Sequence, residues 1–172
     1  STYRNDPLRL DSLNKKVIDV FLEAEDRSFY DHGGVDFFAL TRALYVNVRN
    51  GVISQGGSTI SQQLVKIKYL SNERTIIRKL KELFLTIKLE YHCSKDEILE
   101  LYLNSIYLGN KNRGIKAAAS YYFGKELNYL TTRQIAFLAT LIPAPSRYSK
   151  IHSKKNMYSV NLKIDALLTN LF

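Results

Sequence analysis

The sequence has few of the residues that mark disulfide-rich, collagen-like or disordered proteins. Its 172 residues include one cysteine, three prolines, eight glycines and no tryptophan. A single cysteine excludes an internal disulfide framework, and so little glycine and proline excludes a collagen-like or low-complexity chain. Acidic residues are also scarce, because 16 Asp and Glu stand against 25 Lys and Arg and leave a formal net charge of +9. That excess favours an anionic partner, which is nucleic acid, a phosphorylated ligand or a membrane surface.

Long apolar runs are missing as well. The longest uncharged apolar stretch covers about residues 134–146, contains two prolines and is shorter than the roughly 20 residues of a membrane span. The N-terminus is polar and does not begin with Met, so no signal peptide is visible. With 45% hydrophobic residues, we expect one globular domain over residues 1–172. Because the first residue is not Met, we expect this chain to be a fragment whose targeting segment was removed.

Apolar residues recur at helical spacing almost throughout, and no segment carries a strong strand signal. Capping-box sequences predict helix starts at Thr59, Ser94 and Thr131, and Asp11-Ser12 is a plausible cap for the first helix. These patterns predict an all-α domain. Further helices are expected over about residues 37–48, 72–91 and 115–123, and from about residue 155 to the end.

The expected helix over residues 72–91 separates apolar and charged faces. Its apolar face holds Ile76, Ile77, Leu80, Leu83, Phe84 and Ile87, and its opposite face holds Arg74, Arg78, Lys81 and Glu82. One interpretation is a solvated charged face in which Arg78 supports Glu82 one turn away. The other is an anion clamp with a carboxylate set in it, because guanidinium groups hold phosphate oxygens with forked hydrogen bonds.

Two other segments admit a functional interpretation beside an ordinary one. Gly56–Thr59 precedes a predicted helix. The functional interpretation is an anion site at the helix N-terminal amides, with Lys66 two turns further in, and the ordinary one is a flexible loop and cap. Glu25-Asp26 lies at the C-terminal end of a predicted helix. The functional interpretation is a general base, because the helix dipole there increases the proton affinity of a carboxylate, and the ordinary one is an exposed acidic helix end. His32 alone is more typical of a structural hydrogen-bonding residue.

Metal and nucleic-acid sites have weak support. The three histidines lie far apart in the sequence and match no zinc spacing, so no metal-ligating residues are predicted. Basic and aromatic residues mix around Tyr45–Arg49, but no nucleic-acid motif accompanies them.

Taken in order, the segments resemble the peptidoglycan glycosyltransferases, glycosyltransferase family 51, over roughly residues 8–165. These are the transglycosylase domains of bifunctional penicillin-binding proteins and the monofunctional transglycosylases. One departure is Ile67, where the family usually has Asn. The matching blocks are Glu25–Asp36 for EDxxFxxHxG, Gly57–Lys66 for GSTxxQQLxK, Arg78–Glu90 for RKxxE…LE, Lys95–Asn104 with Gly109 for KxxILExYLN…G, and residues 117–125 for the fifth motif.

The resemblance implies an inverting transfer of the lipid-linked glycan chain to the GlcNAc 4-hydroxyl of lipid II, with release of undecaprenyl pyrophosphate. It implies that Glu25 is the general base and that Glu82 is a second essential acid, which orients Arg and Lys side chains or assists at the pyrophosphate. No cofactor is expected, apart from a divalent cation that the pyrophosphate could recruit. The substrate-binding residues implied are Asp26, Phe29, His32, Ser58, Thr59, Gln62, Gln63, Lys66, Arg74, Arg78 and Lys81.

The family resemblance also implies a lysozyme-like fold with a large helical lobe and a smaller membrane-facing lobe, for which the segment Phe37–Gly57 is the candidate. It implies work at the outer face of the bacterial cytoplasmic membrane, with the N-terminal membrane anchor missing from this chain. The implied partners are lipid II, the growing glycan and the membrane surface, with a transpeptidase domain or other cell-wall synthesis proteins as further candidates, and moenomycin is the implied inhibitor. No nucleic-acid partner is expected. The alternatives are a lysozyme-like glycan hydrolase, a non-catalytic module that binds lipid II or membrane, and a helical nucleic-acid binder. Glu100, Tyr102 and Asn104 are expected to be structural.

Overall fold

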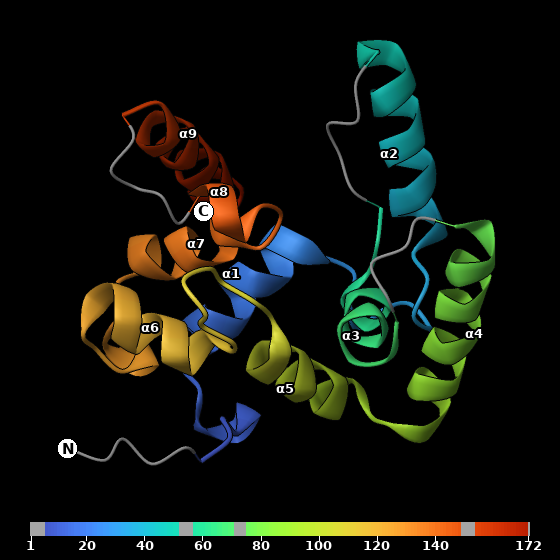
Figure 1. Ribbon diagram of the computed structural model, residues 1–172, viewed down its shortest axis with the longest axis horizontal. Helices are drawn as coiled ribbons and strands as arrows, with labels where there is room; N and C mark the ends of the chain where they lie inside the picture. Colours follow the sequence, from blue (N-terminus) through green and yellow to red (C-terminus); the bar gives the residue numbers. More distant parts are fainter. Residues whose placement is uncertain (1–5, 52–56, 71–74, 149–153, 172) are drawn as a thin grey trace. The chain divides into compact units, whose positions relative to one another are not determined.

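The computed structural model describes residues 6–51, 57–70, 75–148 and 154–171, and its regular elements there are all helices (Figure 1). One isolated antiparallel bridge joins Tyr107 and Arg113. The predicted all-α class is therefore confirmed for these residues. The elements are η1 (Leu10–Ser12), α1 (Lys15–Glu25), α2 (Phe37–Asn50), α3 (Ile60–Tyr69), α4 (Ile76–His92), α5 (Lys95–Ser105), α6 (Ile115–Phe123), η2 (Leu127–Tyr129), α7 (Thr132–Leu141), α8 (Pro145–Tyr148) and α9 (Lys154–Leu171).

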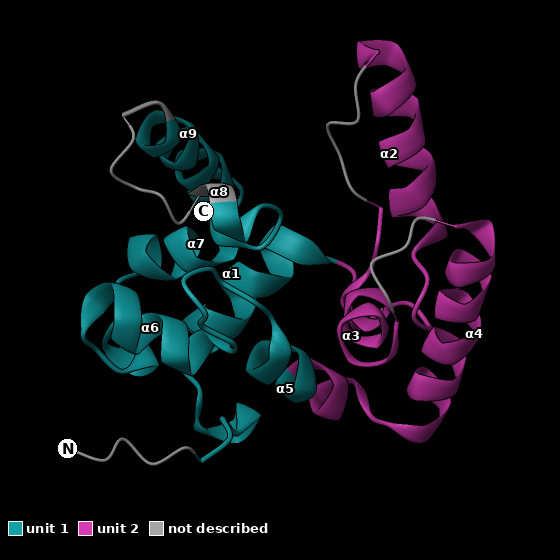
Figure 2. Ribbon diagram, viewed as in Figure 1, with its two compact units in different colours: residues 1–27, 100–172 teal, residues 28–99 magenta. Residues whose placement is uncertain are grey.

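The chain forms two compact units (Figure 2). Residues 1–27 and 100–172 make unit 1, and residues 28–99 make unit 2. The chain thus leaves unit 1 directly after α1 and returns to it within α5. Among the described helices, none combines the length and the apolar character that a membrane span requires.

Unit 1 is built around α7, which packs against both α1 and α9. Ile135, Leu138 and Leu141 of α7 are buried, as are Phe21 of α1 and Ile164 of α9. Burial of each such side chain contributes roughly 1.5–3 kcal/mol. The predicted capping box at Thr131 is present, because Thr131 and Gln134 exchange hydrogen bonds between side chain and backbone. The last residues of α1 are thereby held on a packed helix layer.

The segment before α1 is fixed by side chains from distant parts of unit 1. The Leu8 amide donates to Asn104 Oδ1 at 2.8 Å, and the Leu10 amide donates to Glu100 Oε2 at 2.7 Å. These bonds confirm the structural role expected of Glu100 and Asn104. The cap predicted at Asp11-Ser12 is wrong: Ser12 ends a short 3₁₀ turn, and α1 begins at Lys15.

In unit 2, α3 packs against α4. The capping box predicted at Thr59 is confirmed: the Thr59 side chain accepts from the Gln62 amide, and the Gln62 side chain accepts from the Thr59 amide. The start predicted at Ser94 is also confirmed, since the Ser94 amide donates to Glu97 Oε2 at 2.7 Å. Asp36 is the N-cap of α2, and its carboxylate accepts from the Ala39 amide.

The orientation of α4 differs from the one that the solvated-face interpretation predicts. Its buried residues are Glu82 and Thr86, which lie one turn apart. The apolar face is instead open: Ile76, Ile77, Leu80, Phe84 and Ile87 are all exposed. The solvated charged face is therefore wrong at Glu82. An apolar stripe marks one side of a helix, but it does not say whether protein or another medium covers that side.

Candidate active site

In unit 1, Glu25 is the last residue of α1, as predicted, and Asp26 follows as its C-cap. The Asp26 amide donates to the Leu22 carbonyl at 2.8 Å. Both carboxyl groups therefore lie at the negative pole of the α1 dipole. The Asp26 side chain is buried.

Tyr102 lies within the electrostatic reach of both carboxylates. Burial of its ring, followed by the negative charges of Glu25 and Asp26, raises the pKa of Tyr102 well above its usual value. The phenol consequently stays protonated near the acidic pair. This proximity was not predicted, because Tyr102 is remote from Glu25 in the sequence.

In unit 2, Glu82 is the centre of a charge cluster on α4. Arg78 Nη1 donates to Glu82 Oε2 at 2.8 Å, and Lys79 Nζ binds Glu82 Oε1. The Glu82 side chain is only 3% exposed and that of Arg78 is 16% exposed. Lys79 was not among the predicted site residues. Its position three residues before Glu82 was a sequence signal for an ion pair between the two side chains.

Arg78 also carries an unused donor. Its Nε is buried and has no hydrogen-bond partner among the described residues. A buried donor without an acceptor costs about 1–3 kcal/mol, so this atom suits an incoming anion. Arg74, predicted to act beside it, lies outside the described residues.

A pocket of about 640 Å³ opens next to this cluster, entirely within unit 2. Two cationic side chains, Arg78 and Lys81, share its wall with apolar ones. This mixture suits an amphiphile whose anionic group meets the cations while its chain meets the apolar wall. The full lining is Tyr69, Leu70, Thr75, Ile77, Arg78, Lys81, Phe84 and Leu85.

The predicted contacts at the start of α3 divide into two groups. Thr59 and Gln62 are buried and bond to backbone, and Thr59 Oγ1 also donates to the Gly34 carbonyl at 2.6 Å. They therefore shape the helix start from within. Ser58 and Lys66 are exposed and Gln63 is partly exposed, so these three face outward.

The loop after α1 is organised around Phe29, which is fully buried. Its ring meets His32 edge-on, and Lys95 Nζ lies 4.6 Å from its centre. His32 Nδ1 accepts from the Gly34 amide at 3.1 Å, which matches the structural interpretation of this histidine. Phe29 and His32 thus hold the loop in shape, and Phe29 presents no surface to a ligand.

The predicted residues therefore fall into both units. Glu25 and Asp26 belong to unit 1, and Phe29, His32 and those described on α3 and α4 belong to unit 2. Within the ranges that the structure describes, His, Cys, Asp and Glu side chains form no group of three that could hold a metal ion.

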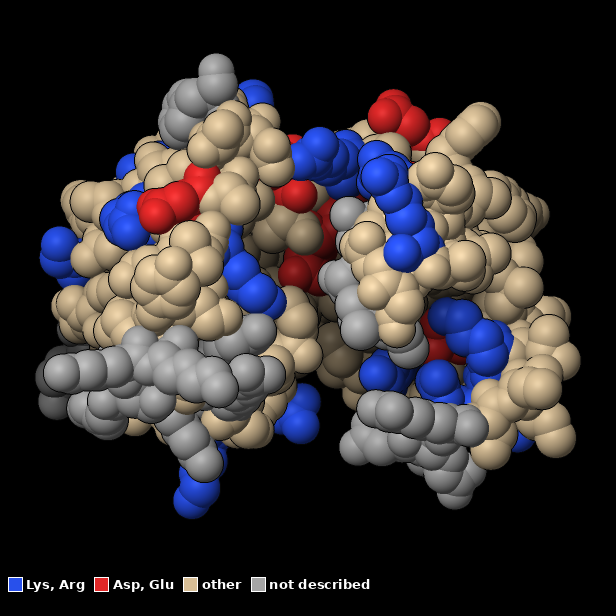
Figure 3. Space-filling view, turned by 90° about the horizontal axis from the view of Figure 1, so that it is seen from above, with Lys and Arg blue, Asp and Glu red and all other residues tan. Residues whose placement is uncertain are grey.

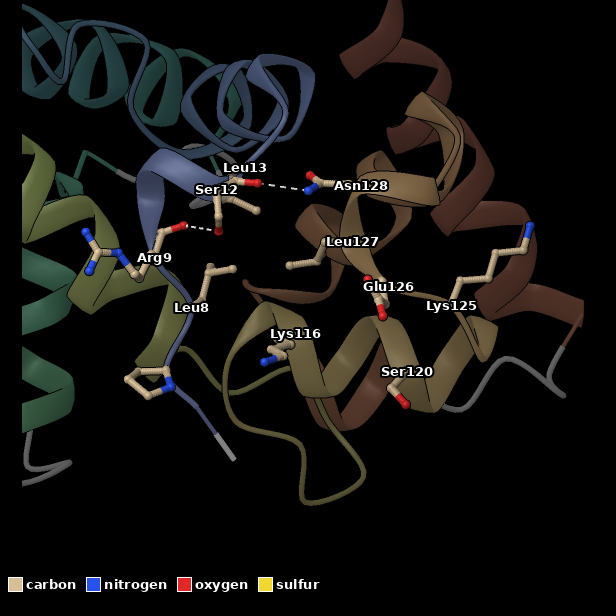
Figure 4. Close-up of a pocket in the computed structure, with 11 residues that line it drawn as sticks. Leu8, Arg9, Ser12, Leu13, Lys116, Ser120, Lys125, Glu126, Leu127 and Asn128 are labelled. Carbon is tan, nitrogen blue, oxygen red and sulfur yellow. Dashed lines mark hydrogen bonds between the residues drawn. The ribbon is translucent and has the colours of Figure 1, made fainter. Parts of the chain in front are cut away.

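A separate pocket of about 580 Å³ in unit 1 contains no predicted site residue (Figure 4). Leu8 and Leu127 point into it from opposite sides, while Lys125 extends outward. Asn128 Nδ2 donates to the Ser12 carbonyl at 2.9 Å along its edge. This pocket lies where the N-terminal segment meets residues 116–128 of unit 1.

Comparison with known proteins identifies the family. Residues 1–170 match the family model described as Transglycosylase. The chain is 48% identical over 152 residues to penicillin-binding protein 1A of Haemophilus influenzae, covering 88% of this chain and 18% of that protein. It is 45% identical over 160 residues to penicillin-binding protein 1A of Aquifex aeolicus, covering 92% and 22%, and 43% identical over 156 residues to penicillin-binding protein 1F of Bacillus subtilis, covering 90% and 22%. The chain thus spans about a fifth of the length of these curated relatives, and it belongs to the transglycosylase family, whose members polymerise the glycan strands of peptidoglycan.

Proposed function

We propose that this domain polymerises peptidoglycan by inverting transfer of a lipid-linked glycan chain to lipid II. The observation that carries the proposal is the pair Arg78 and Lys81 on the wall of an apolar pocket, with Arg78 Nε unpaired among the described residues. A lipid pyrophosphate has the matching chemistry, since it joins an anion to an apolar chain. A hydrolase of free glycan has no such group to bind.

Glu25 is the general base of the proposed reaction. The GlcNAc 4-hydroxyl oxygen of lipid II attacks C1 of the donor sugar while its proton passes to the Glu25 carboxylate. The bond from C1 to the phosphate oxygen breaks, and its electron pair leaves with the pyrophosphate. Attack opposite to the leaving group inverts C1 and gives a β-1,4 link. The match of Glu25-Asp26 to the first motif of the family, at the carboxyl end of α1, supports this role.

Cations stabilise the departing pyrophosphate, on which negative charge grows in the transition state. We assign this role to Arg78, Lys81 and Lys66, with Arg74 as a further candidate from the sequence. Glu82 is the positioning acid of the cluster, because its two oxygens already bind Arg78 and Lys79. Ser58 and Gln63 supply hydrogen bonds from the start of α3.

The reaction needs no cofactor, and a divalent cation, where it helps, binds to the pyrophosphate oxygens. Glu82 has little capacity left for a metal ion, because both of its oxygens are engaged by cationic side chains. Polymerisation is accordingly expected to continue in EDTA, at a reduced rate if the pyrophosphate recruits a cation.

The domain works at the outer surface of the cytoplasmic membrane. Helix α2 exposes Phe38 at 90% and Val48 at 74%, beside the exposed Arg42 and Arg49. The open apolar face of α4 adds a second surface of the same kind. Figure 3 shows Lys and Arg side chains set among uncharged surface. Apolar groups bordered by cations suit an interface with anionic lipid.

A penicillin-binding transpeptidase domain is the proposed partner in a longer protein. The supporting observation is that the relatives are penicillin-binding proteins and that this chain spans only about a fifth of them. Labelled penicillin, added to the product of the complete gene, would tag such a domain covalently. Absence of any label would contradict this partner and leave the transferase proposal intact.

The test of the central proposal is polymerisation of labelled lipid II in detergent by the wild type and by Glu25→Gln. Polymer is expected from the wild type, and none from Glu25→Gln, which keeps the shape of the side chain but cannot act as the base. Polymer from both would refute the role of Glu25. Cleavage of preformed glycan by the wild type would instead support a hydrolase, and lipid II binding without either reaction would support a non-catalytic module.

A further inference from the structure

Helix α4 turns a row of polar side chains toward the interior of unit 2. Glu82, Thr86 and Glu90 follow one another at four-residue steps and so share one face. Thr86 Oγ1 donates to the Glu82 carbonyl at 2.7 Å. The row therefore continues from the charge cluster at Glu82 to a second carboxylate two turns away, which the proposed mechanism does not use.

Glu90 joins three separate segments of unit 2. Its Oε1 accepts from Ser61 Oγ, in the first turn of α3, and from Lys95 Nζ, at the start of α5, at 2.8 Å. The Glu90 side chain is 10% exposed. A buried ion pair gives weak net stability, because loss of hydration offsets the attraction. Its value here is that one oxygen fixes two partners in a defined geometry.

The stem of Glu90 also supports the turn at Gly34. A Cβ added to Gly34 would lie 2.8 Å from Glu90 Cγ and 2.8 Å from Thr86 Cγ2, so the turn rests directly on α4. The carbonyl of Gly34 in turn accepts from Thr59 Oγ1 at 2.6 Å. Glu90 thus reaches the start of α3 by two routes, through Ser61 and through Gly34 and Thr59.

We propose that Glu90 is a positioning residue for the pyrophosphate site, an inference that rests on the proposed function. It holds the first turn of α3, and with it the outward-facing Ser58 and Lys66, in register with Arg78 on α4. The donor pyrophosphate is held from both helices, so a shift between them misaligns the cations that stabilise its departure. Small misplacements of such groups lower rates by as much as about 100-fold.

The test compares Glu90→Gln with Glu90→Met, two variants of nearly equal length. Gln keeps a carbonyl oxygen that can accept from both Ser61 and Lys95, whereas Met offers no comparable acceptor. For Glu90→Met we expect kcat to fall about 30-fold with KM for lipid II within about twofold. Glu90→Gln should restore kcat to within about threefold of the wild type. Glu97→Met, at the cap of α5, is the matched control and should keep wild-type kcat.

A second measurement separates this inference from the proposed function. Binding of undecaprenyl pyrophosphate is titrated directly, and Glu90→Met should weaken it about tenfold while Glu90→Gln does not. Equal kcat and equal binding for the folded Met variant, with only a lower Tm, would overturn the inference and leave the transferase standing. A wild type that binds the pyrophosphate without polymerising would refute the transferase but still test Glu90. No pyrophosphate binding by the wild type would overturn both.

Discussion

At the scale of single residues, Glu82 and Gly34 are two positions whose surroundings tolerate little change. Glu82 is buried between two cations on its own helix, and Gly34 carries a turn against α4. Both lie inside sequence motifs, but their roles differ: Glu82 organises charge, and Gly34 lets the turn pack closely against the Thr86 and Glu90 side chains of α4.

Replacing Glu82 by Ala should lower the free energy of unfolding by roughly 1–3 kcal/mol, because Arg78 and Lys79 lose their common acceptor. Polymerisation should fall with it, since the two cations then repel each other and Arg78 is no longer held at the pocket. Urea unfolding and lipid II polymerisation measure the two effects. Full activity in a stably folded Glu82→Ala variant would contradict the positioning role.

Replacing Gly34 by Ala should cost roughly 1–3 kcal/mol, because φ is +91° and the new Cβ meets Glu90 and Thr86 at 2.8 Å. The neighbouring Gly33→Ala is the matched control, since nothing lies within 4 Å of its Cβ. Thermal unfolding of both variants checks the expectation. Equal losses of Tm at the two glycines would show that the close packing of Gly34 is unimportant.

At the scale of elements, local signals predicted helix starts well and predicted surroundings poorly. The capping boxes at Thr59, Ser94 and Thr131 were found in the sequence because each needs only four residues. The start of α1 was misplaced, because the segment before it is held by Asn104 and Glu100, which are remote in the sequence. The family resemblance named Glu25 and Glu82 as candidates. No local pattern predicted that Tyr102 lies within electrostatic reach of Glu25, whereas the three-residue spacing of Lys79 and Glu82 was a local signal for their ion pair.

The start of α2 should make stability depend on pH. The Ala39 amide, then the Ser28 hydroxyl, lower the pKa of Asp36 below its ordinary value. A carboxyl with a lowered pKa in the folded state stabilises the protein above the unfolded pKa of about 3.9, and this contribution is lost as the pH falls through the folded value.

The stability advantage of the wild type over Asp36→Asn should therefore shrink as the pH falls below about 4. Asn still caps a helix, so the comparison isolates the charge. Urea unfolding of both proteins between about pH 3 and pH 7 gives the measurement. A difference that stays constant over this range would exclude a contribution from the Asp36 charge.

At the scale of the whole molecule, charge and exposed apolar surface point to the same partner. The net charge is +9, and unit 2 exposes apolar residues along both α2 and α4. Vesicles that contain anionic lipid combine the two attractions. Binding should weaken as salt rises, because the Debye length shortens to about 8 Å at physiological ionic strength.

Phe38→Ser and Phe84→Ser should each weaken binding to anionic vesicles about tenfold, since each removes a side chain worth roughly 1.5–3 kcal/mol when buried. Both are exposed, so folding should be unaffected. Tyr129→Ser, an exposed aromatic of unit 1, is the control. Vesicle co-sedimentation gives the affinities, and an equal loss for Tyr129→Ser would contradict a surface confined to unit 2.

Helix α4 carries its buried polar row and its exposed apolar residues on two different sides, and this separation has a practical consequence. Glu82, Thr86 and Glu90 face inward, while Ile76, Leu80 and Ile87 face out. Polar residues at Ile76, Leu80 and Ile87, none of which lines the pocket beside Arg78, should therefore give a domain that stays in solution without detergent. The buried row would keep its residues in such a redesign. Adsorption to membranes and the contacts that position the charged groups could then be changed independently in one short helix.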